Sequence, residues 1–316
     1  MSIKSCSLRQ SARGIALLIV LWMLALLSVI AGSLVFSSRT EILVADNITK
    51  LAKAEAAADA GVHKALYELL NSPPTDPARW QGNGQTHSLT LGDARLFITI
   101  LDESAKIDIN TPNEALLRNL FLSQGANEST AESLTDTILD WRDADNFRRL
   151  HGAEKEDYFA AGRNYGPANG NFESIEELRQ VLGVTDDLYA RLEPLITVFS
   201  GQSGINSAVA SRGVLLALPG ASPESVDAYL EQRRSALEQG QVIPVFPPAQ
   251  PFGAAAINSI VTIQVVAVLE DNTRFLREAV VRLTPVAKEP VAILAWRSPV
   301  TMTSESTVLA AMQLLN

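Results

Sequence analysis

The sequence predicts an α+β protein in which a long N-terminal helix accompanies an antiparallel sheet and a large helical segment. An uncharged run near the N-terminus passes without any proline into apolar residues at helical spacing. Alternating apolar residues at 88–102 and 260–285 indicate two groups of strands. About 155 residues of mostly helical pattern separate these groups, which is too many for a loop and indicates an inserted domain.

Composition limits the possible functions. The chain has 316 residues, 47% of them hydrophobic, which is enough for two domains and an appendage. A net charge of −9 argues against nucleic-acid binding, which depends on Lys and Arg contacts with phosphates. The single cysteine, Cys6, excludes an intramolecular disulfide, and three scattered histidines argue against a zinc site.

The N-terminal run Ile15–Phe36 contains 22 residues without a charge. As a helix it would be about 33 Å long, enough to cross a hydrocarbon core of about 30 Å. The charges before it, Lys4, Arg9 and Arg13, are all positive and predict an N-inside orientation with the rest exported. Three interpretations remain: a discarded signal peptide, an uncleaved single-pass anchor, or a segment that is cut and retained.

The helix is expected to continue well beyond the uncharged run. Apolar residues recur at helical spacing at Ile42, Ala45, Ile48, Leu51, Ala52, Val62, Ala65, Leu66 and Leu69. Ser72–Pro74 provides the stop. These observations predict one helix over 15–71, which is apolar in its first half and amphipathic in its second half.

The strand predictions place one hairpin at 88–102 around Gly-Asp and a second at 260–285 around Asp-Asn-Thr, with a last strand at Val291–Trp296. The Pro- and Gly-rich stretch 239–259 is expected to be an exit linker in which Pro247 and Pro248 exclude a helix. No function is assigned to the tail after Arg297.

The N-terminal arrangement, with Arg13-Gly14 before an apolar helix, resembles that of type IV pilins and pseudopilins. The resemblance implies that a prepilin peptidase cuts between Gly14 and Ile15 and that the new N-terminus is methylated. The helix would be retained as a membrane anchor and filament stem. The large insertion and the phrases DESAKIDINTP, DWRDAD, GAEKEDY and AILAWR resemble the K class of minor pseudopilins of type II secretion systems.

One position departs from the general pilin pattern. Family members normally carry Glu at the fifth residue after the cut, where it pairs with the N-terminal amine of a neighbouring subunit. Here that position is Ile19, and no acid lies between Ile15 and Arg39. A subunit without this acid avoids burying an unpaired charge when no subunit lies ahead of it. The departure suits a filament tip and is a known property of the K class.

The resemblance implies a pseudopilin fold with a helical insertion. The expected parts are a prepilin leader, a transmembrane and stem helix, a first sheet portion, the inserted α-domain, a second sheet portion and a tail, at 1–14, 15–71, 72–102, 103–258, 259–297 and 298–316.

Two stretches inside the insertion, Asn110–Arg142 and Asn206–Arg234, have the pattern helix, glycine turn, helix. Such helix–hairpin–helix units hold phosphates in DNA-binding proteins, so a membrane-tethered DNA-binding or uptake protein is the alternative function. Residues 128–193 contain 15 Asp and Glu against 7 Lys and Arg, which argues against that alternative and favours a protein scaffold.

Acidic and amide side chains concentrate in Asp140–Ser174. Hard oxygen ligands at short spacing are typical of calcium sites, and magnesium fits less well without a substrate phosphate. An EF-hand loop is absent. A solvated acidic face paired with Arg142, Arg148 and Arg149 is the alternative. The K class is known to bind calcium in its α-domain, so a structural calcium ion is expected, with the candidate ligands Asp140, Asp143, Asp145, Glu154, Asp157 and Asn169.

No catalytic arrangement is recognisable, so the chain is not expected to be an enzyme. The resemblance implies a minor pseudopilin at the pseudopilus tip that initiates assembly and supports protein export. Implied partners are the I- and J-class minor pseudopilins, the major pseudopilin and prepilin peptidase, with contact to secreted substrates left open and no nucleic acid. The expected location is the bacterial inner membrane, single-pass, with most of the chain in the periplasm.

Overall fold

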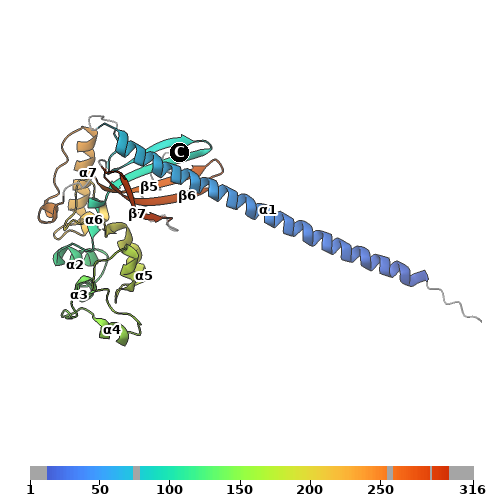
Figure 1. The fold of residues 1–316 in the computed structure, drawn as a ribbon, viewed down its shortest axis with the longest axis horizontal. Helices are drawn as coiled ribbons and strands as arrows, with labels where there is room; N and C mark the ends of the chain where they lie inside the picture. The colour runs from blue at the N-terminus through green and yellow to red at the C-terminus, as the bar shows by residue number, and fades with distance from the viewer. Residues whose placement is uncertain (1–12, 74–78, 255–258, 285–286, 299–316) are drawn as a thin grey trace, which may run out of the picture. The chain divides into compact units, whose positions relative to one another are not determined.

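A five-stranded antiparallel sheet and a long N-terminal helix define the fold, as predicted (Figure 1). The computed structural model describes residues 13–73, 79–254, 259–284 and 287–298. The strands are β1 (Asn83–Leu91), β2 (Ala94–Asp102), β3 (Ile107–Asp108), β4 (Ile196–Thr197), β5 (Ile260–Leu269), β6 (Arg274–Leu283) and β7 (Val291–Arg297). The helices are α1 (Arg13–Asn71), α2 (Glu114–Ser123), α3 (Glu128–Arg142), α4 (Lys155–Ala160), α5 (Asp186–Leu192), α6 (Arg212–Leu216) and α7 (Pro223–Glu238). Four 3₁₀ helices accompany them: η1 (Glu103–Ala105), η2 (Ile175–Gln180), η3 (Glu193–Leu195) and η4 (Pro247–Phe252).

The sheet has the order β1-β2-β5-β6-β7, and every neighbouring pair is antiparallel. Both predicted hairpins and the last predicted strand are present. The first hairpin starts earlier than expected, at Asn83, because the first half of β1 is polar and lacks the alternation that marks a strand. The two strands are joined by the two-residue turn Gly92-Asp93. Such turns need a positive φ, and Gly92 has a φ of 61°.

Helix α1 contributes a buried stripe to the sheet. Its small residues Ala54, Ala58, Val62 and Ala65 are fully buried and recur every three or four positions. They pack against the apolar face of the central strands. The resulting sheet core comprises Ala54, Ala58, Val62, Ala65, Leu69, Ala94, Leu96, Ile98, Ile100, Val261, Ile263, Val265, Ala267, Leu269, Ala279, Val281 and Leu283.

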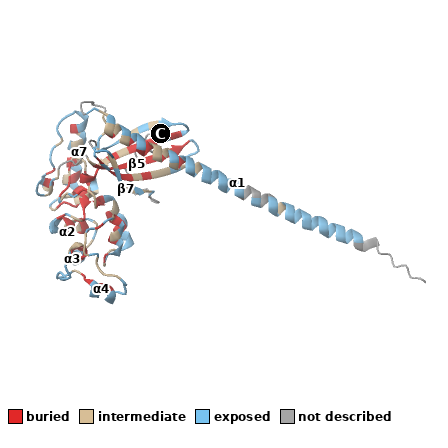
Figure 2. Ribbon diagram, viewed as in Figure 1, coloured by how far each residue is buried: buried red, intermediate tan, exposed pale blue. Residues whose placement is uncertain are grey.

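The earlier apolar positions of the predicted amphipathic pattern are exposed. Ile42, Ile48 and Leu51 have exposed fractions of 68%, 63% and 48%, and the described side chains before Ala54 are almost all exposed (Figure 2). The helical periodicity is therefore correct, but burial within the single chain begins only at Ala54.

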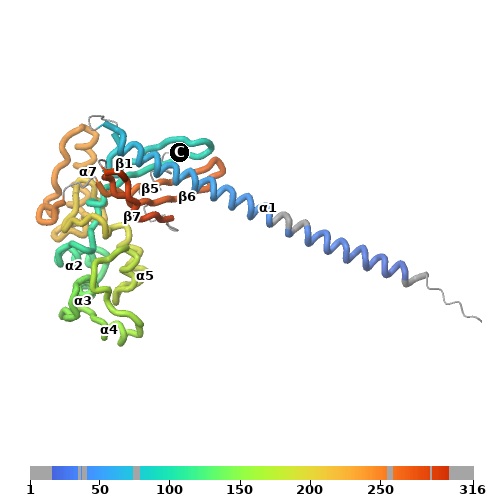
Figure 3. Tube along the Cα trace, in the orientation of Figure 1, coloured from blue at the N-terminus to red at the C-terminus, as the bar shows by residue number. Residues whose placement is uncertain are grey.

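Between β2 and β5 the chain forms α2 to α7 and the 3₁₀ helices, which surround a second apolar cluster (Figure 3). We call this cluster the helical core. Its largest fully buried members include Ile107, Leu117, Phe121, Tyr158 and Tyr189. The prediction of mostly helical structure here missed the short parallel pair β3–β4.

The expectation that Pro247 and Pro248 exclude a helix is wrong in part. They occupy the first positions of η4. Proline is tolerated there because the first N–H groups of a helix need no internal partner, and its fixed φ suits the turn. Within the described residues 239–254 no α-helix forms, as predicted.

A buried carboxylate links the two cores. Glu103, in η1 directly after β2, accepts hydrogen bonds from Thr262 of β5 and Thr197 of β4. The Nζ atom of Lys106 lies 3.0 Å from its Oε1. All three partners are donors, so the buried charge is satisfied inside the protein.

Candidate functional site

The candidate site is the acidic loop between α3 and α4. Helix α3 begins after Asn127, whose side chain accepts the N–H of Thr130 at 2.8 Å, and ends at Arg142 with Asp143 as the C-cap. Glu154 is the N-cap of α4. The two helix ends therefore position the acids at either end of the loop.

Asp140 and Asp157, two of the predicted ligands, already have partners that include an arginine. The buried carboxylate of Asp140 accepts the N–H of Arg149, at 3.3 and 3.2 Å from its two oxygens. Gly152 leaves room for it, since a Cβ there would lie 2.0 Å from Asp140 Oδ2. Asp157 accepts from Arg148 Nη1 and from the backbone N–H of Glu154, each at 2.9 Å.

Three other predicted ligands carry buried oxygens that no other side chain among the described residues contacts, although the Glu154 carboxylate faces backbone N–H groups in the capping box of α4. These are both carboxylate oxygens of Glu154, which is 3% exposed, Oδ1 of Asp143 and Oδ1 of Asn169. Asn169 has a positive φ of 51°, and its Nδ2 donates to Asn146 Oδ1 at 3.0 Å. Buried oxygens of this kind are costly unless water or a cation satisfies them.

The acids of the loop also influence one another electrostatically. Burial raises the pKa of Asp140 to about 6. Burial, then the charges of Asp140, Asp143 and Asp145, raise the pKa of Glu154. Burial and the charge of Asp145 likewise raise the pKa of Asp143. Each carboxylate would ionise more readily beside a cation.

The structure therefore brings the predicted ligands together only in part. Within residues 13–298 as far as they are described, no group of three or more His, Cys, Asp and Glu side chains already has a metal-binding arrangement. Asp145 is exposed and its Oδ1 accepts the N–H of Phe147 at 2.8 Å. The unpartnered oxygens are nevertheless the hard donors that calcium prefers, so the residues fit that ion in chemistry.

The alternative of an acidic face neutralised by arginines also holds only in part. Arg148 and Arg149 contact Asp157 and Asp140, the latter at 3.5 Å through Nε. Arg142 instead donates to the backbone carbonyl of Ile109 at 2.6 Å. No arginine contact reaches Glu154 or Asp143 within 4.0 Å among the described side chains.

Sequence reasoning missed two contributors to the loop. Asn146 holds the side chain of Asn169, and the backbone N–H of Arg149 holds Asp140. The Asn residue directly after Asp145 was an available signal, because short amides commonly orient such loops. The backbone contact had no signal in the sequence.

The helix pairs predicted from the two glycine turns are present. Gly125 between α2 and α3 has φ of 90°, and Gly220 between α6 and α7 has φ of 82°. The first turns after them carry the acids Glu128 and Glu224. Negative side chains at these helix N-termini oppose phosphate binding.

The other candidate residues lie at the start of α1. Residues 1–12 of the expected leader lie outside the described residues, and Gly14 and Ile15 are in the first turn of the helix. Ala16–Leu34 has a mean hydropathy of 2.6, long and apolar enough to cross a membrane by length and composition. Ile19 is 54% exposed in this segment.

Comparison with known proteins finds similar chains in type II secretion systems. Residues 94–201 match the family model for protein K of the type II secretion system. The chain is 28% identical over 225 residues to type II secretion system protein K of Klebsiella pneumoniae, covering 65% of this chain and 69% of that protein. Identity to the protein K of Pectobacterium carotovorum is 31% over 210 residues, with coverages of 60% and 63%.

The protein K of Pseudomonas aeruginosa is 26% identical over 246 residues, with coverages of 70% and 73%. The fold is similar to a chain in the crystal structure of the GspK–GspI–GspJ complex from the type 2 secretion system of enterotoxigenic Escherichia coli. That match has a TM-score of 0.52 and 17% identity, and it covers 84% of this chain and 99% of that chain.

The helix-and-sheet fold and these matches make the chain similar to structural components of type II secretion systems. The chain is thus similar to the protein K family of the type II secretion system, both over residues 94–201 and in the relatives named above.

Proposed function

We propose that this protein is a minor pseudopilin that occupies the tip of the type II secretion pseudopilus and starts its assembly with I- and J-class subunits. The observation that carries this proposal is Ile19. The described segment Ala16–Leu34 contains no acid that could neutralise the amine of a subunit ahead. The structural relative in a complex with GspI and GspJ supports partners of those classes.

The tip proposal is tested by subunit counting. Labelled full-length chain is co-expressed with the I-, J- and major pseudopilins, and filaments are imaged. The wild type and Ile19→Leu should label one end of each filament, whereas Ile19→Glu should appear along its length. Wild-type label distributed along the filament would contradict the proposal.

We further propose that the chain is processed and anchored as a pseudopilin. A prepilin peptidase would cut between Gly14 and Ile15, the new N-terminus would be methylated, and the helix would cross the inner membrane with the rest in the periplasm. The positive flank and the apolar span support this orientation. Mass spectrometry should find Ile15 at the N-terminus, no cut in Gly14→Leu, and normal cutting in the control Gly32→Leu. A start at Met1 in the wild type contradicts it.

The segment 103–258 is proposed to act as an inserted α-domain with helix–hairpin–helix-like units that serve as a protein scaffold without catalysis. Its separate helical core supports this. We propose that calcium orders its acidic loop. Glu154, Asp143 and Asn169 would supply the buried oxygens, with Asp145 and Asp140 beside them and Asp157 supporting the N-terminus of α4.

Calcium is tested by thermal melting of the full-length chain in detergent. Calcium at about 100 times its Kd should stabilise the wild type by about 2.7 kcal/mol, and magnesium should do less. Asp143→Asn should lose this gain. The matched control Glu156→Gln, an exposed acid in α4, should keep it. An unchanged melting temperature of the wild type would exclude the ion.

A further inference from the structure

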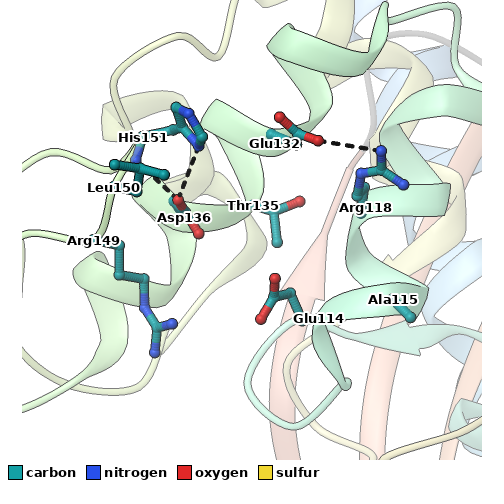
Figure 4. Close-up of a pocket in the computed structure, with 9 residues that line it drawn as sticks. All are labelled: Glu114, Ala115, Arg118, Glu132, Thr135, Asp136, Arg149, Leu150 and His151. Carbon is teal, nitrogen blue, oxygen red and sulfur yellow. Dashed lines mark hydrogen bonds and ion pairs between the residues drawn. The ribbon is translucent and has the colours of Figure 1, made fainter.

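A pocket of about 790 Å³ lies beside the acidic loop, between α2 and α3 (Figure 4). Its walls include Glu114 and Arg118 of α2, Glu132 and Asp136 of α3, and Leu150 and His151 of the loop. The volume is in the range of pockets that bind peptides and small molecules. It is separate from the buried oxygens of the calcium proposal.

Most charges around the pocket are balanced within the protein. Arg118 contacts the carboxylates of Glu128 and Glu132, the second at 3.3 Å. Arg149, also on the wall, lies near Asp140. These two cations are therefore neutralised by acids of their own.

Asp136 is likewise engaged. It accepts the backbone N–H of His151 at 3.0 Å, and the ring Nδ1 of His151 lies 3.6 Å from the same oxygen (Figure 4). This contact also fixes the loop next to the pocket.

Glu114 differs from these groups. Among the described residues its carboxylate has neither an ion pair nor a hydrogen bond, and Figure 4 shows it directed into the pocket. The unbalanced charge of the pocket is thus negative. A cationic group is its electrostatic complement.

The loop wall of the pocket, across from Glu114, carries an exposed apolar side chain (Figure 4). Leu150 is 83% exposed, and Phe147, three residues earlier on the same loop, is 82% exposed. Side chains of this size exposed next to a pocket are typical of an interaction surface. The loop that presents them is held by the contacts of Asp145 and Asp140 with backbone N–H groups.

We propose that this pocket docks an extended polypeptide segment of another protein that carries Arg or Lys beside an apolar side chain. The cation meets Glu114, and the apolar side chain packs on Leu150. The proposed tip function rests on Ile19 and not on this surface, so the two proposals can fail independently.

The test measures fluorescence anisotropy of a rhodamine-labelled Gly-Leu-Arg-Leu-Gly-amide peptide with the full-length chain in detergent and calcium. Saturable binding is expected, and Glu114→Gln should weaken it about tenfold, as for the loss of one charge-assisted contact. Leu150→Ser should weaken it about threefold through lost apolar burial. The same peptide with Gln in place of Arg should bind as weakly to the wild type as the Arg peptide binds to Glu114→Gln.

The matched control is Glu270→Gln, an exposed acid in the β5–β6 turn, which should leave affinity unchanged. Equal melting temperatures of the variants show that each remains folded. The proposal is overturned if the wild type does not bind, if Glu114→Gln binds fully, or if the Gln peptide binds as well as the Arg peptide.

Discussion

Two buried charges, Arg277 on the sheet and Glu154 in the acidic loop, differ in how they are satisfied. On the sheet, the buried guanidinium of Arg277 lies 2.6 Å from both Glu55 and Asp59 of α1. In the acidic loop, the equally buried Glu154 has no counter-ion or side-chain partner among the described residues, and its carboxylate faces only backbone N–H groups at the start of α4.

The difference indicates which part of the molecule is complete by itself. A buried charge with good partners is tolerated, whereas an unpartnered one costs free energy until a counter-ion or water satisfies it. The sheet and the attached part of α1 thus form a self-sufficient scaffold. The acidic loop instead holds a buried carboxylate, Glu154, that has no counter-ion among the described residues.

The largest expected effect comes from disturbing the packing of α1 on the sheet. A Cβ at Gly61 would lie 2.6 Å from Val265 Cγ1, so Gly61→Leu should force α1 away from β5 and cost about 3 kcal/mol. Regional hydrogen exchange should rise in β2 and β5 but not in α3. Ala56→Leu, on an exposed position of the same helix, is the control and should change little. Equal stability of both variants would contradict this packing.

The next largest effect is the dependence of the stability of the helical region on pH. The pKa of Asp140 is about 6 in the folded protein, compared with about 3.9 in an unfolded chain. As pH falls, the folded state therefore takes up a proton on this carboxylate before the unfolded state does. In calcium-free buffer the helical region should gain about 2–3 kcal/mol as pH falls from 7 to 4. Asp140→Asn should reduce this gain in regional hydrogen exchange, leaving the part that comes from the raised pKa values of Glu154 and Asp143. A flat wild-type profile would contradict the raised pKa.

The sheet junction should respond in the opposite direction. Burial alone would raise the pKa of Glu103, but Lys106 and the Thr197 and Thr262 hydroxyls outweigh it and lower the pKa. Stability from this group is present above its unfolded pKa of about 4.3 and is lost as pH falls through the lower folded value. Exchange in β5 should therefore increase only below about pH 4, and not in Glu103→Gln.

A smaller effect is expected for Glu154→Gln, whose change in stability should reverse sign when calcium is added. Without calcium, Glu154→Gln should stabilise the chain by about 1 kcal/mol, because it removes a buried carboxylate that lacks a counter-ion among the described residues. With calcium, the same variant should be less stable than the wild type because a ligand is lost. Melting curves with and without calcium test both halves. Destabilisation of equal size in both buffers would assign Glu154 a purely local role.

Much of the fold was predictable from local pattern. Helix α1, both hairpins and β7 were predicted because periodicity and turn residues report on one element at a time. The exposure of Ile42 and Ile48 was not predictable, since the same spacing suits burial within the chain or against another molecule. The η4 helix was missed because proline excludes an α-helix interior but not a short 3₁₀ turn.

The acidic loop shows the limit more clearly. Its composition indicated oxygen ligands, but it could not distinguish Asp157, which contacts Arg148, from Glu154, which has no counter-ion among the described residues. Those assignments depend on how far each side chain lies from a donor several residues away.

The sequence by itself determined the long apolar helix, the antiparallel strands, the excess of acids and the absence of an acid at Ile19. These properties belong to single residues or short periods. Only the tertiary structure decided which charges are buried, which have partners, and that Glu114 faces an open pocket. Burial and pairing arise from contacts between distant segments, and these contacts set the electrostatic cost of each charge.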